Sequence, residues 1–263
     1  MKLIPYWHDT APVFSGTEKV PVEGDYDVAV VGGGFTGLSA SLALAKKGAR
    51  VILLEAGRLG GCASGRNGGM CNNGFAQDYA GMVGRLGADV AKRLYQSFNS
   101  AVDTVEQIVR DEAIDCDFKR VGKLKMAAKP AHYDKLARSQ ELMAQGADPD
   151  AYMVSRQDMP SEVGTDRYFG GLIFPRSAAM HMGKFVHGLA SAAARHGVRL
   201  HEDSPVTGMK RLNGHAHRLS TPSGDVTARQ VLLATGTSAV GPLSYFRRRI
   251  VPVGAFLIVT EPL

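Results

Sequence analysis

The chain has 263 residues, of which 44% are hydrophobic and 21% charged, and its formal net charge is +6. This length and composition predict one large or two small globular domains and exclude a disordered or collagen-like chain. The three cysteines, Cys62, Cys71 and Cys116, form no CxxC pair, so neither a disulfide framework nor a structural zinc site is indicated.

The first sixty residues predict a leader followed by a strand, a helix and a second strand. Residues 1–24 lack periodicity and are rich in proline and glycine, which predicts an extended leader on the domain surface. The apolar run 26–31 predicts a strand buried on both faces. Residues 37–47 have helical spacing and end before Gly48, and residues 50–55 predict a second buried strand. This order is typical of a right-handed parallel crossover unit.

The rest of the chain alternates between helical and strand patterns. Residues 57–74 are rich in glycine and polar residues, which predicts a long functional loop. Apolar periodicity predicts helices over 89–111, 131–145 and 181–196. Strands are predicted at 121–128, 171–174, 198–202, 206–211, 216–220, 226–228 and 231–234, with Asn213-Gly214 and Ser223-Gly224 as hairpin turns.

Three glycines follow the first strand in the GxGxxG register, at Gly32, Gly34 and Gly37. The first permits a tight turn, the second lets a pyrophosphate approach the backbone, and the third allows close packing of helix and strand. The helix that begins here directs its N-terminus at the phosphate charge. Glu55, about twenty residues on at the end of the second strand, is placed to bind an adenosine ribose. The motif predicts a dinucleotide site but does not separate NAD from FAD.

A second glycine-rich stretch, residues 61–70, adds a further candidate binding loop. Its closely spaced glycines expose backbone N–H groups, and Ser64, Arg66 and Asn67 add donors suited to phosphate and ring oxygens. The strand predicted at 231–234 is followed directly by Thr235 and Gly236.

These motifs carry a resemblance to known flavoproteins. The strand ending in Ala-Thr-Gly at 234–236 resembles the return strand of glutathione-reductase-like FAD-binding proteins. The loop 61–70, with Tyr6-Trp7 and Thr10-Ala11-Pro12 in the leader, is similar to the D-amino-acid-oxidase-like (DAO) superfamily, in particular its gamma-glutamylputrescine oxidase-like branch. Met70 stands where relatives often have glutamine, and Cys62 replaces a small apolar residue.

The resemblance implies FAD as the cofactor. It places Ser64 and its neighbours at the pyrophosphate, residues 67–69 against the isoalloxazine, and Val206 at the adenine through backbone groups. The implied cofactor-binding residues are Gly32, Gly34, Phe35, Thr36, Gly37, Glu55, Ala56, Ala63, Ser64, Arg66, Asn67, Gly68, Gly69, Val206, Thr235 and Gly236.

The predicted fold is α/β, with a glutathione-reductase-like, Rossmann-type FAD-binding domain and a second, sheet-containing substrate domain that is incomplete at its C-terminus. Residues 1–24 form the leader, residues 25–111 and 181–245 the FAD-binding domain, and residues 112–180 and 246–263 the substrate portion. Residues 250–263 resemble a substrate-domain strand that in relatives is followed by more sheet. We therefore expect a truncated or split form in which a partner chain or self-association completes the sheet.

The activity that the resemblance implies is oxidation of the C–N bond of an amine or amino acid. A hydride passes to flavin N5, water hydrolyses the imine, and oxygen is the expected acceptor, giving hydrogen peroxide. The protein orients and tunes the flavin, and no catalytic residue is identified. An NAD(P)-dependent dehydrogenase and a non-catalytic FAD-binding fragment remain alternatives.

Other candidate groups have less specific patterns. Lys123, Lys125 and Arg176 could meet a substrate carboxylate, although solvated surface positions are the favoured interpretation. Cys62 or Cys71 could be imagined as a site of covalent flavin attachment, but a packed or idle thiol is the favoured interpretation. The histidines have no carboxylate or cysteine at ligand spacing, so no metal is predicted.

The remaining predictions concern partners and location. The basic residues are scattered apart from Arg247-Arg248-Arg249 and are not interleaved with aromatic residues, so no nucleic-acid partner is predicted. The resemblance implies a small-molecule amine or amino-acid substrate. No apolar run approaches the roughly 18–20 residues of a spanning helix, and the N-terminus lacks a signal-peptide core. A cytoplasmic protein without a membrane span is expected.

Overall fold

The computed structural model describes residues 2–212, 214–237, 245 and 248–260, and the chain divides into two compact units. The first unit comprises Met1–Gly68, Ile114–Cys116 and His181–Leu263, and the second comprises Gly69–Ala113 and Asp117–Met180. The sequence-based division kept residues 69–111 with the glycine motifs, whereas the structure places them in the second unit.

The first unit is built on a six-stranded sheet with the order β8-β2-β1-β11-β10-β9. Strand β1 lies between β2 and β11 and is parallel to both, while β8 continues the parallel part beyond β2. Strands β10 and β9 extend the sheet as antiparallel neighbours. The strands are β1 (Asp25–Val31), β2 (Val51–Leu54), β8 (Arg199–His201), β9 (Gly208–Arg211), β10 (His217–Thr221) and β11 (Gly224–Leu233). The predicted strand-helix-strand unit with parallel pairing is thus confirmed.

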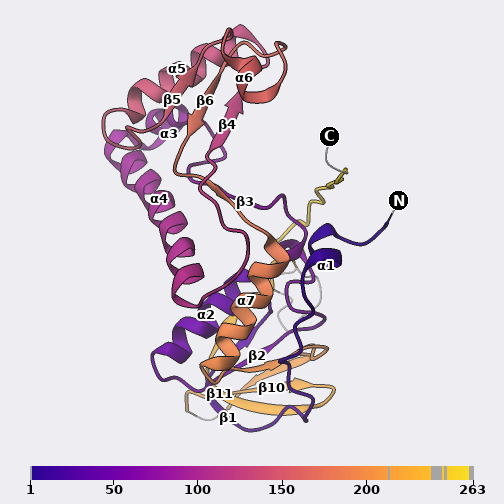
Figure 1. The fold of residues 1–263 in the computed structure, drawn as a ribbon. Helices are drawn as coiled ribbons and strands as arrows, with labels where there is room; N and C mark the ends of the chain where they lie inside the picture. Colours follow the sequence, from indigo (N-terminus) through magenta and orange to yellow (C-terminus); the bar gives the residue numbers. More distant parts are fainter. Residues whose placement is uncertain (1, 213, 238–244, 246–247, 261–263) are drawn as a thin grey trace. The chain divides into compact units, whose positions relative to one another are not determined.

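Helices α2 (Phe35–Lys46) and α7 (Met182–Arg195) lie together beside this sheet (Figure 1). The central strands are buried on both faces, since Ala29, Val30, Ile52 and Leu53 are all fully buried. This burial explains why β1 and β2 read as continuous apolar runs rather than as alternating ones.

Three segments of the first unit differ from their predictions. The strands expected at 226–228 and 231–234 are one strand, β11, because hydrogen bonding to β1 continues through the polar residues Arg229 and Gln230. The leader contains the short helix α1 (Tyr6–Thr10) and is not extended throughout. Residues 251–260 form no strand, since no neighbouring strand in the described part of the chain pairs with them.

The hairpin between β10 and β11 is present, with Pro222 and Ser223 as its turn, one position earlier than predicted. The other predicted turn, Asn213-Gly214, includes a residue outside the described ones.

The second unit combines helices with a three-stranded antiparallel sheet of order β4-β6-β5. Its apolar core includes Tyr79, Tyr95, Leu136, Met143 and Leu172. The elements are β3 (Met70–Cys71), α3 (Tyr79–Leu86), α4 (Ala88–Asp111), β4 (Lys123–Met126), α5 (Pro130–Met143), β5 (Tyr152–Val154), α6 (Met159–Val163), β6 (Gly171–Phe174) and β7 (Ala178–Ala179). The helices predicted at 89–111 and 131–145 and the strands predicted at 121–128 and 171–174 are confirmed as α4, α5, β4 and β6, with ends that differ by at most two residues. The other elements of this unit were not predicted.

A buried polar network explains why residues 69–111 belong to this unit. Asp148 accepts hydrogen bonds from the Tyr95 hydroxyl at 2.9 Å and from the Asn73 amide at 3.1 Å. The same Asn73 amide nitrogen donates to Asn99 Oδ1 at 2.8 Å, and Asn73 Oδ1 accepts from Ser177 Oγ at 2.8 Å. Because buried polar groups are costly when unpaired, this network ties Tyr95 of α4 to Asp148, 53 residues away, and Asn73 to Ser177, 104 residues away.

Candidate dinucleotide site in the first unit

The candidate site lies where the parallel strands β1, β2 and β11 end. Gly32 follows β1, and its N–H donates to the carbonyl of Leu54 at 2.9 Å. Ala234 follows β11 and donates to the carbonyl of Val31 at 2.8 Å. Gly32 has a φ of +110°, and a Cβ there would lie 2.5 Å from the Ala234 carbonyl oxygen. The structure therefore brings Gly32 and the Ala234-Thr235-Gly236 segment together at the carboxyl edge of the sheet, where α/β folds bind ligands.

The N-terminus of α2 begins at this edge. Gly34 is its N-cap and accepts from Leu38 N–H at 3.0 Å, and the Phe35 N–H donates to Ser64 Oγ at 3.1 Å. Among the described residues, nothing accepts a hydrogen bond from the N–H of Thr36 or Gly37. A helix start with free N–H groups carries a partial positive charge suited to a phosphate.

The absence of side chains at this helix start fits a phosphate group. Gly34 has φ −82° and ψ −174°, an extended backbone that any residue adopts, so its conformation does not require glycine. A Cβ at Gly34 would lie 2.8 Å from Ser64 Oγ, the atom that accepts the Phe35 N–H at the helix start. Gly37 is needed for packing, because its Cβ would overlap the carbonyl oxygen of Gly32. The local geometry agrees with the turn role predicted for Gly32 and the packing role predicted for Gly37, and the pyrophosphate role of Gly34 stays a prediction.

Glu55 is held in a fixed position at the end of β2. Its Oε2 accepts from Gly33 N–H at 2.6 Å and its Oε1 from Gly57 N–H at 2.9 Å. A carboxylate that accepts two backbone hydrogen bonds still has lone pairs for a ligand hydroxyl. The arrangement is that of a positioned acceptor rather than a freely rotating surface glutamate.

A backbone segment before β9 runs beside Glu55. Glu55 N–H donates to the carbonyl of His201 at 2.9 Å, and Ser204 N–H donates to the carbonyl of Glu55 at 2.8 Å. Val206 follows in this segment, and its side chain is buried in the cluster that includes Val31 and Leu54. Ala56, next to Glu55, is exposed. The segment therefore offers backbone groups, not the Val206 side chain, to a ligand.

The glycine-rich loop contains the short 3₁₀ helix Ala63–Gly65 and is held by its own polar side chains. Asn67 Nδ2 donates to the Ser64 carbonyl at 2.8 Å, and Arg66 Nε donates to the Gly61 carbonyl at 2.8 Å. Asn67 thus fixes the loop, and the predicted direct contact of its side chain with a ring stays a prediction.

The ends of the loop differ in their surroundings. Gly68 is exposed in the first unit. Gly69 belongs to the second unit, where its carbonyl accepts from Met180 N–H at 3.0 Å. Of the cysteines considered for flavin attachment, Cys62 is exposed, and burial raises the pKa of the Cys71 thiol, which disfavours its thiolate.

Helix α1 contributes contacts that sequence reasoning missed. The Trp7 indole N–H donates to the Asn67 carbonyl at 2.6 Å. His8 lies against Gly65, where a Cβ would overlap its ring, and burial lowers the pKa of His8 while a backbone hydrogen bond at Gly60 acts in the opposite direction. The Tyr6-Trp7 aromatic pair was the available signal, but five helical residues are too few to show a period.

A tautomer-specific contact fastens α1 to α7. His181 caps α7 by accepting the Lys184 N–H on Nδ1 at 3.2 Å, so its Nε2 carries the proton when the ring is neutral. Nε2 lies 2.9 Å from Thr10 Oγ1, which itself donates to the Tyr6 carbonyl at 2.7 Å. The Trp7 ring packs on the same histidine at 4.8 Å. Thus α1 is anchored on one side to α7 and on the other to the glycine-rich loop.

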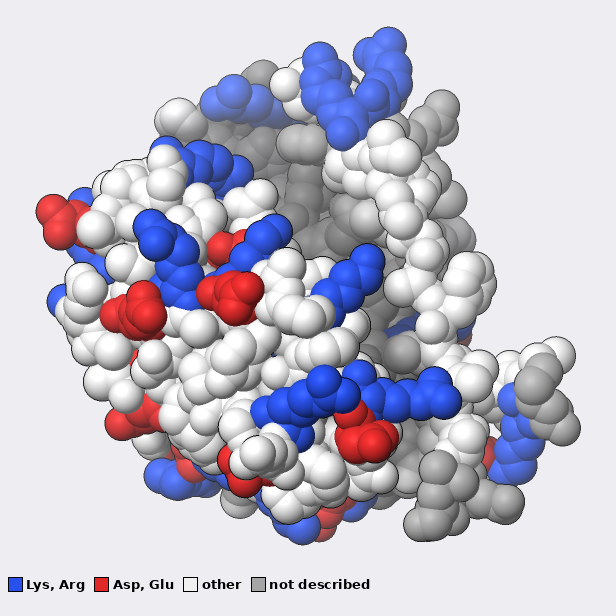
Figure 2. Space-filling view, turned by 90° about the horizontal axis from the view of Figure 1, so that it is seen from above, with Lys and Arg blue, Asp and Glu red and all other residues white. Residues whose placement is uncertain are grey.

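Two further observations concern the charged side chains of the surface, and membrane spans and metal sites. Figure 2 shows that Lys and Arg side chains are interspersed with Asp and Glu over most of the face it presents. In the described part of the chain, no helix is long and apolar enough to cross a membrane, and no three His, Cys, Asp or Glu side chains gather to hold a metal ion.

A parallel sheet with a glycine cradle at a helix start and an acid at the next strand end defines a dinucleotide-binding fold. Residues 27–263 match the family described as DAO, FAD dependent oxidoreductase, and the chain belongs to this family. A probable oxidoreductase OrdL of Haemophilus influenzae is 35% identical over 242 residues, which cover 90% of this chain and 56% of the relative. The gamma-glutamylputrescine oxidoreductase of Escherichia coli is 33% identical over 239 residues, covering 90% and 55%.

Solved structures share the fold. The glycine oxidase of Geobacillus kaustophilus aligns with a TM-score of 0.64 and 24% identity, covering 81% of this chain and 56% of that one. The L-amino acid deaminase of Proteus myxofaciens aligns with a TM-score of 0.71 and 18% identity, covering 86% and 49%. The chain spans about half the length of the curated relatives it matches.

Proposed function

We propose that the site at the carboxyl edge of the first unit's sheet binds FAD, and that the chain is part of an oxidoreductase acting on the C–N bond of an amine or amino acid. The observation that carries the cofactor proposal is Gly34. Its backbone does not require glycine, yet a Cβ there would lie 2.8 Å from Ser64 Oγ at the α2 N-terminus, where a side chain would hinder the approach of a pyrophosphate. Glu55, held by two backbone N–H groups, is the proposed acceptor for the ribose.

The remaining contacts are assigned by their place around this cradle. Ser64 Oγ, the free N–H groups of α2 and the Thr235-Gly236 turn would hold the pyrophosphate. The backbone near Val206 would meet the adenine, and the loop around Asn67 would meet the ring system. These assignments are supported by the shared edge of β1, β2 and β11 and by membership of the family.

The substrate class follows from the relatives. They include a gamma-glutamylputrescine oxidoreductase and a glycine oxidase, whose names describe an amine and an amino acid. When bound, FAD would supply the two-electron oxidation, taking a hydride from the carbon next to nitrogen so that water hydrolyses the imine, with oxygen as acceptor and hydrogen peroxide as product. The chain's own residues bind and orient the cofactor, and no acid or base of this chain is assigned to the reaction.

The first test is FAD binding by the purified 263-residue chain. Visible flavin bands that remain after desalting support the proposal. Trp7, the only tryptophan of the chain, contacts the loop at Asn67, so its fluorescence should fall as FAD binds. A chain that keeps NAD instead of FAD, or neither, contradicts the cofactor assignment. Amine-dependent release of peroxide then tests the activity separately.

A matched pair of glycine variants tests whether the pyrophosphate of the cofactor binds at the N-terminus of α2. Gly34→Val adds a side chain before α2 at a backbone conformation that valine adopts, so we expect FAD retention to be lost while the fold remains. Gly84→Val serves as the control, because it adds the same side chain on α3 of the second unit, where nothing lies within 4 Å of the Cβ. Equal FAD affinity in Gly34→Val and in the unmodified chain would contradict the placement of the pyrophosphate. Circular dichroism of both variants checks the fold.

A further inference from the structure

The second unit contains a pocket of its own, separate in sequence and composition from the glycine cradle. Its lining comes from the segment 74–79, from α4, α5, β4 and β6, and every lining residue belongs to the second unit. The space between its lining side chains is about 380 Å³, a volume that includes open solvent.

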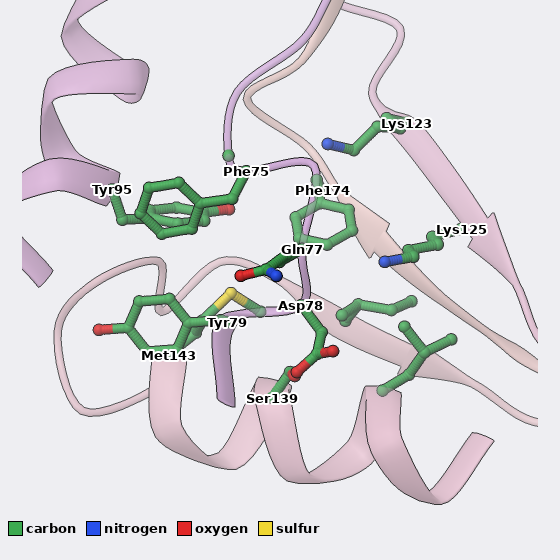
Figure 3. Close-up of a pocket in the computed structure, with 13 residues that line it drawn as sticks. Phe75, Gln77, Asp78, Tyr79, Tyr95, Lys123, Lys125, Ser139, Met143 and Phe174 are labelled. Atoms are coloured by element: carbon green, nitrogen blue, oxygen red, sulfur yellow. The ribbon is translucent and has the colours of Figure 1, made fainter. Parts of the chain in front are cut away.

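Two lysines from the same strand enter this pocket. Lys123 and Lys125 are two positions apart on β4, so their side chains leave the same face of the strand. Figure 3 shows both amines directed from β4 toward the aromatic and aliphatic side chains of the pocket. Among the residues that the structure describes, no carboxylate forms an ion pair with either amine. Two cations thus face one small space, and neither is in an ion pair with a described carboxylate.

Lys123 is held firmly and is partly removed from water. Its Nζ donates to the Asn73 carbonyl at 2.7 Å and lies 4.2 Å from the centre of the Phe174 ring. These contacts leave two of its three donors for a ligand. Burial, and secondly the charge of Lys125, lowers the pKa of Lys123 to about 8. A bound anion would offset both effects by favouring the ammonium form.

The opposite side of the pocket is apolar. Its walls are Phe75, Tyr79, Leu136, Met143 and Leu172, which suit a hydrocarbon body.

One acidic side chain also lines the space. Asp78 directs Oδ1 to Gly81 N–H at 2.8 Å at the start of α3, where the helix dipole stabilises its charge. Figure 3 shows Asp78 beside Ser139 of α5, while the lysines enter from β4. A ligand's negative group therefore belongs at the lysine end.

We propose that this pocket, called here the lysine pocket, binds a small monocarboxylic acid, with its carboxylate at Lys123 and Lys125 and its apolar chain among the aromatic and aliphatic walls. A phosphate fits less well, because a dianion calls for more donors than these two amines supply and would leave the apolar walls without a partner. The proposal does not depend on FAD binding, since all the groups it uses lie in the second unit.

The test compares hexanoate with hexanamide, its neutral counterpart of similar shape, by calorimetry and saturation-transfer NMR on the 263-residue chain. Hexanoate should bind at least tenfold more tightly, because a charge-assisted hydrogen bond contributes about 1.5–3 kcal/mol. Its affinity should fall as the pH rises through about 8, where Lys123 loses its proton. Equal affinities of the two compounds would overturn the proposal.

Variants locate the site. Lys123→Met keeps the length of the side chain and removes its charge, and should weaken hexanoate binding about tenfold or more. Lys125→Met should weaken it by about two- to fivefold, a smaller effect because this lysine is exposed. Lys135→Met is the control, since Lys135 is an exposed residue of α5 outside the lining, and should bind normally. If Lys123→Met does not fold, Lys125→Met decides, and unchanged binding there overturns the proposal.

Norleucine separates the two sources of such a carboxylate. Its added ammonium group could be accepted by the Asp78 carboxylate, so tighter binding than hexanoate identifies the ligand as an amino acid. Equal or weaker binding identifies a plain organic acid. Whichever ligand binds more tightly, Lys125→Met must weaken its binding, and unchanged binding means that the proposed site is wrong.

Discussion

Replacing Trp7 with Phe removes one hydrogen bond, from the indole N–H to the Asn67 carbonyl, and keeps an aromatic ring beside Tyr6 and His181. A net hydrogen bond of this kind contributes about 0.5–1.5 kcal/mol. That free energy corresponds to a roughly two- to tenfold change in an equilibrium constant. The tenfold limit applies when the whole free energy of this hydrogen bond serves to order the glycine-rich loop for FAD binding. We therefore expect FAD to bind Trp7→Phe about two- to tenfold more weakly.

The assay is titration of FAD followed by flavin fluorescence, with amide hydrogen exchange of residues 63–67 as an independent measure of loop order. Tyr6→Phe is the matched control, because Tyr6 is an exposed neighbour on α1 whose hydroxyl has no hydrogen-bond partner in the described part of the chain. The variant Trp7→Phe should exchange faster in the loop, and Tyr6→Phe should not. Unchanged affinity and exchange in Trp7→Phe, or the same loss in both variants, would refute the role assigned to α1.

Three further variants test the fold. Tyr95→Phe removes a buried donor to a carboxylate and should lower the free energy of unfolding by about 1–3 kcal/mol in urea, whereas Tyr152→Phe, at an exposed position, should not. Burial lowers the pKa of His201 below 6.5, so the unfolded chain binds a proton that the folded chain does not, and stability is lost as the pH falls below about 6.5. In His201→Asn, the urea midpoint of unfolding should therefore depend less on pH. An unchanged dependence would contradict this reasoning. Gly37→Ala should prevent folding of the first unit, because the new Cβ would overlap the carbonyl oxygen of Gly32. Gly84→Ala is the control, since its Cβ enters open space on helix α3. It should raise the melting temperature, because alanine stabilises a helix by up to about 1 kcal/mol relative to glycine.

The first strand-helix-strand unit was predictable because its signals are local. β1 and β2 are short apolar runs. Gly32, Gly34 and Gly37 all lie within the six residues that connect β1 to the first turn of α2. The polar pair Arg229-Gln230 misled the strand prediction, because hydrogen bonding to β1 overrides side-chain pattern there.

The division into units could not be read in the same way. It depends on contacts such as Tyr95 to Asp148 and Asn73 to Ser177, which join residues far apart in the chain and carry no local signature. The Trp7 contact with Asn67 is a further case, since a separation of 60 residues leaves no period to detect. The lysine pair at 123 and 125 was visible as a spacing, but only the structure shows the apolar walls facing it.

The position of β1 between β2 and β11 also has a consequence for synthesis. The strand β1 leaves the ribosome about 190 residues before Gly224, the first residue of its second neighbour. At a translation rate of roughly 5–20 residues per second, one edge of β1 stays unpaired for about 10–40 s. During that time Val28–Val31 present apolar side chains and free backbone groups, which is the kind of edge that recruits other chains. Nascent chains of this protein should therefore depend on chaperone binding near the amino terminus until β11 is made.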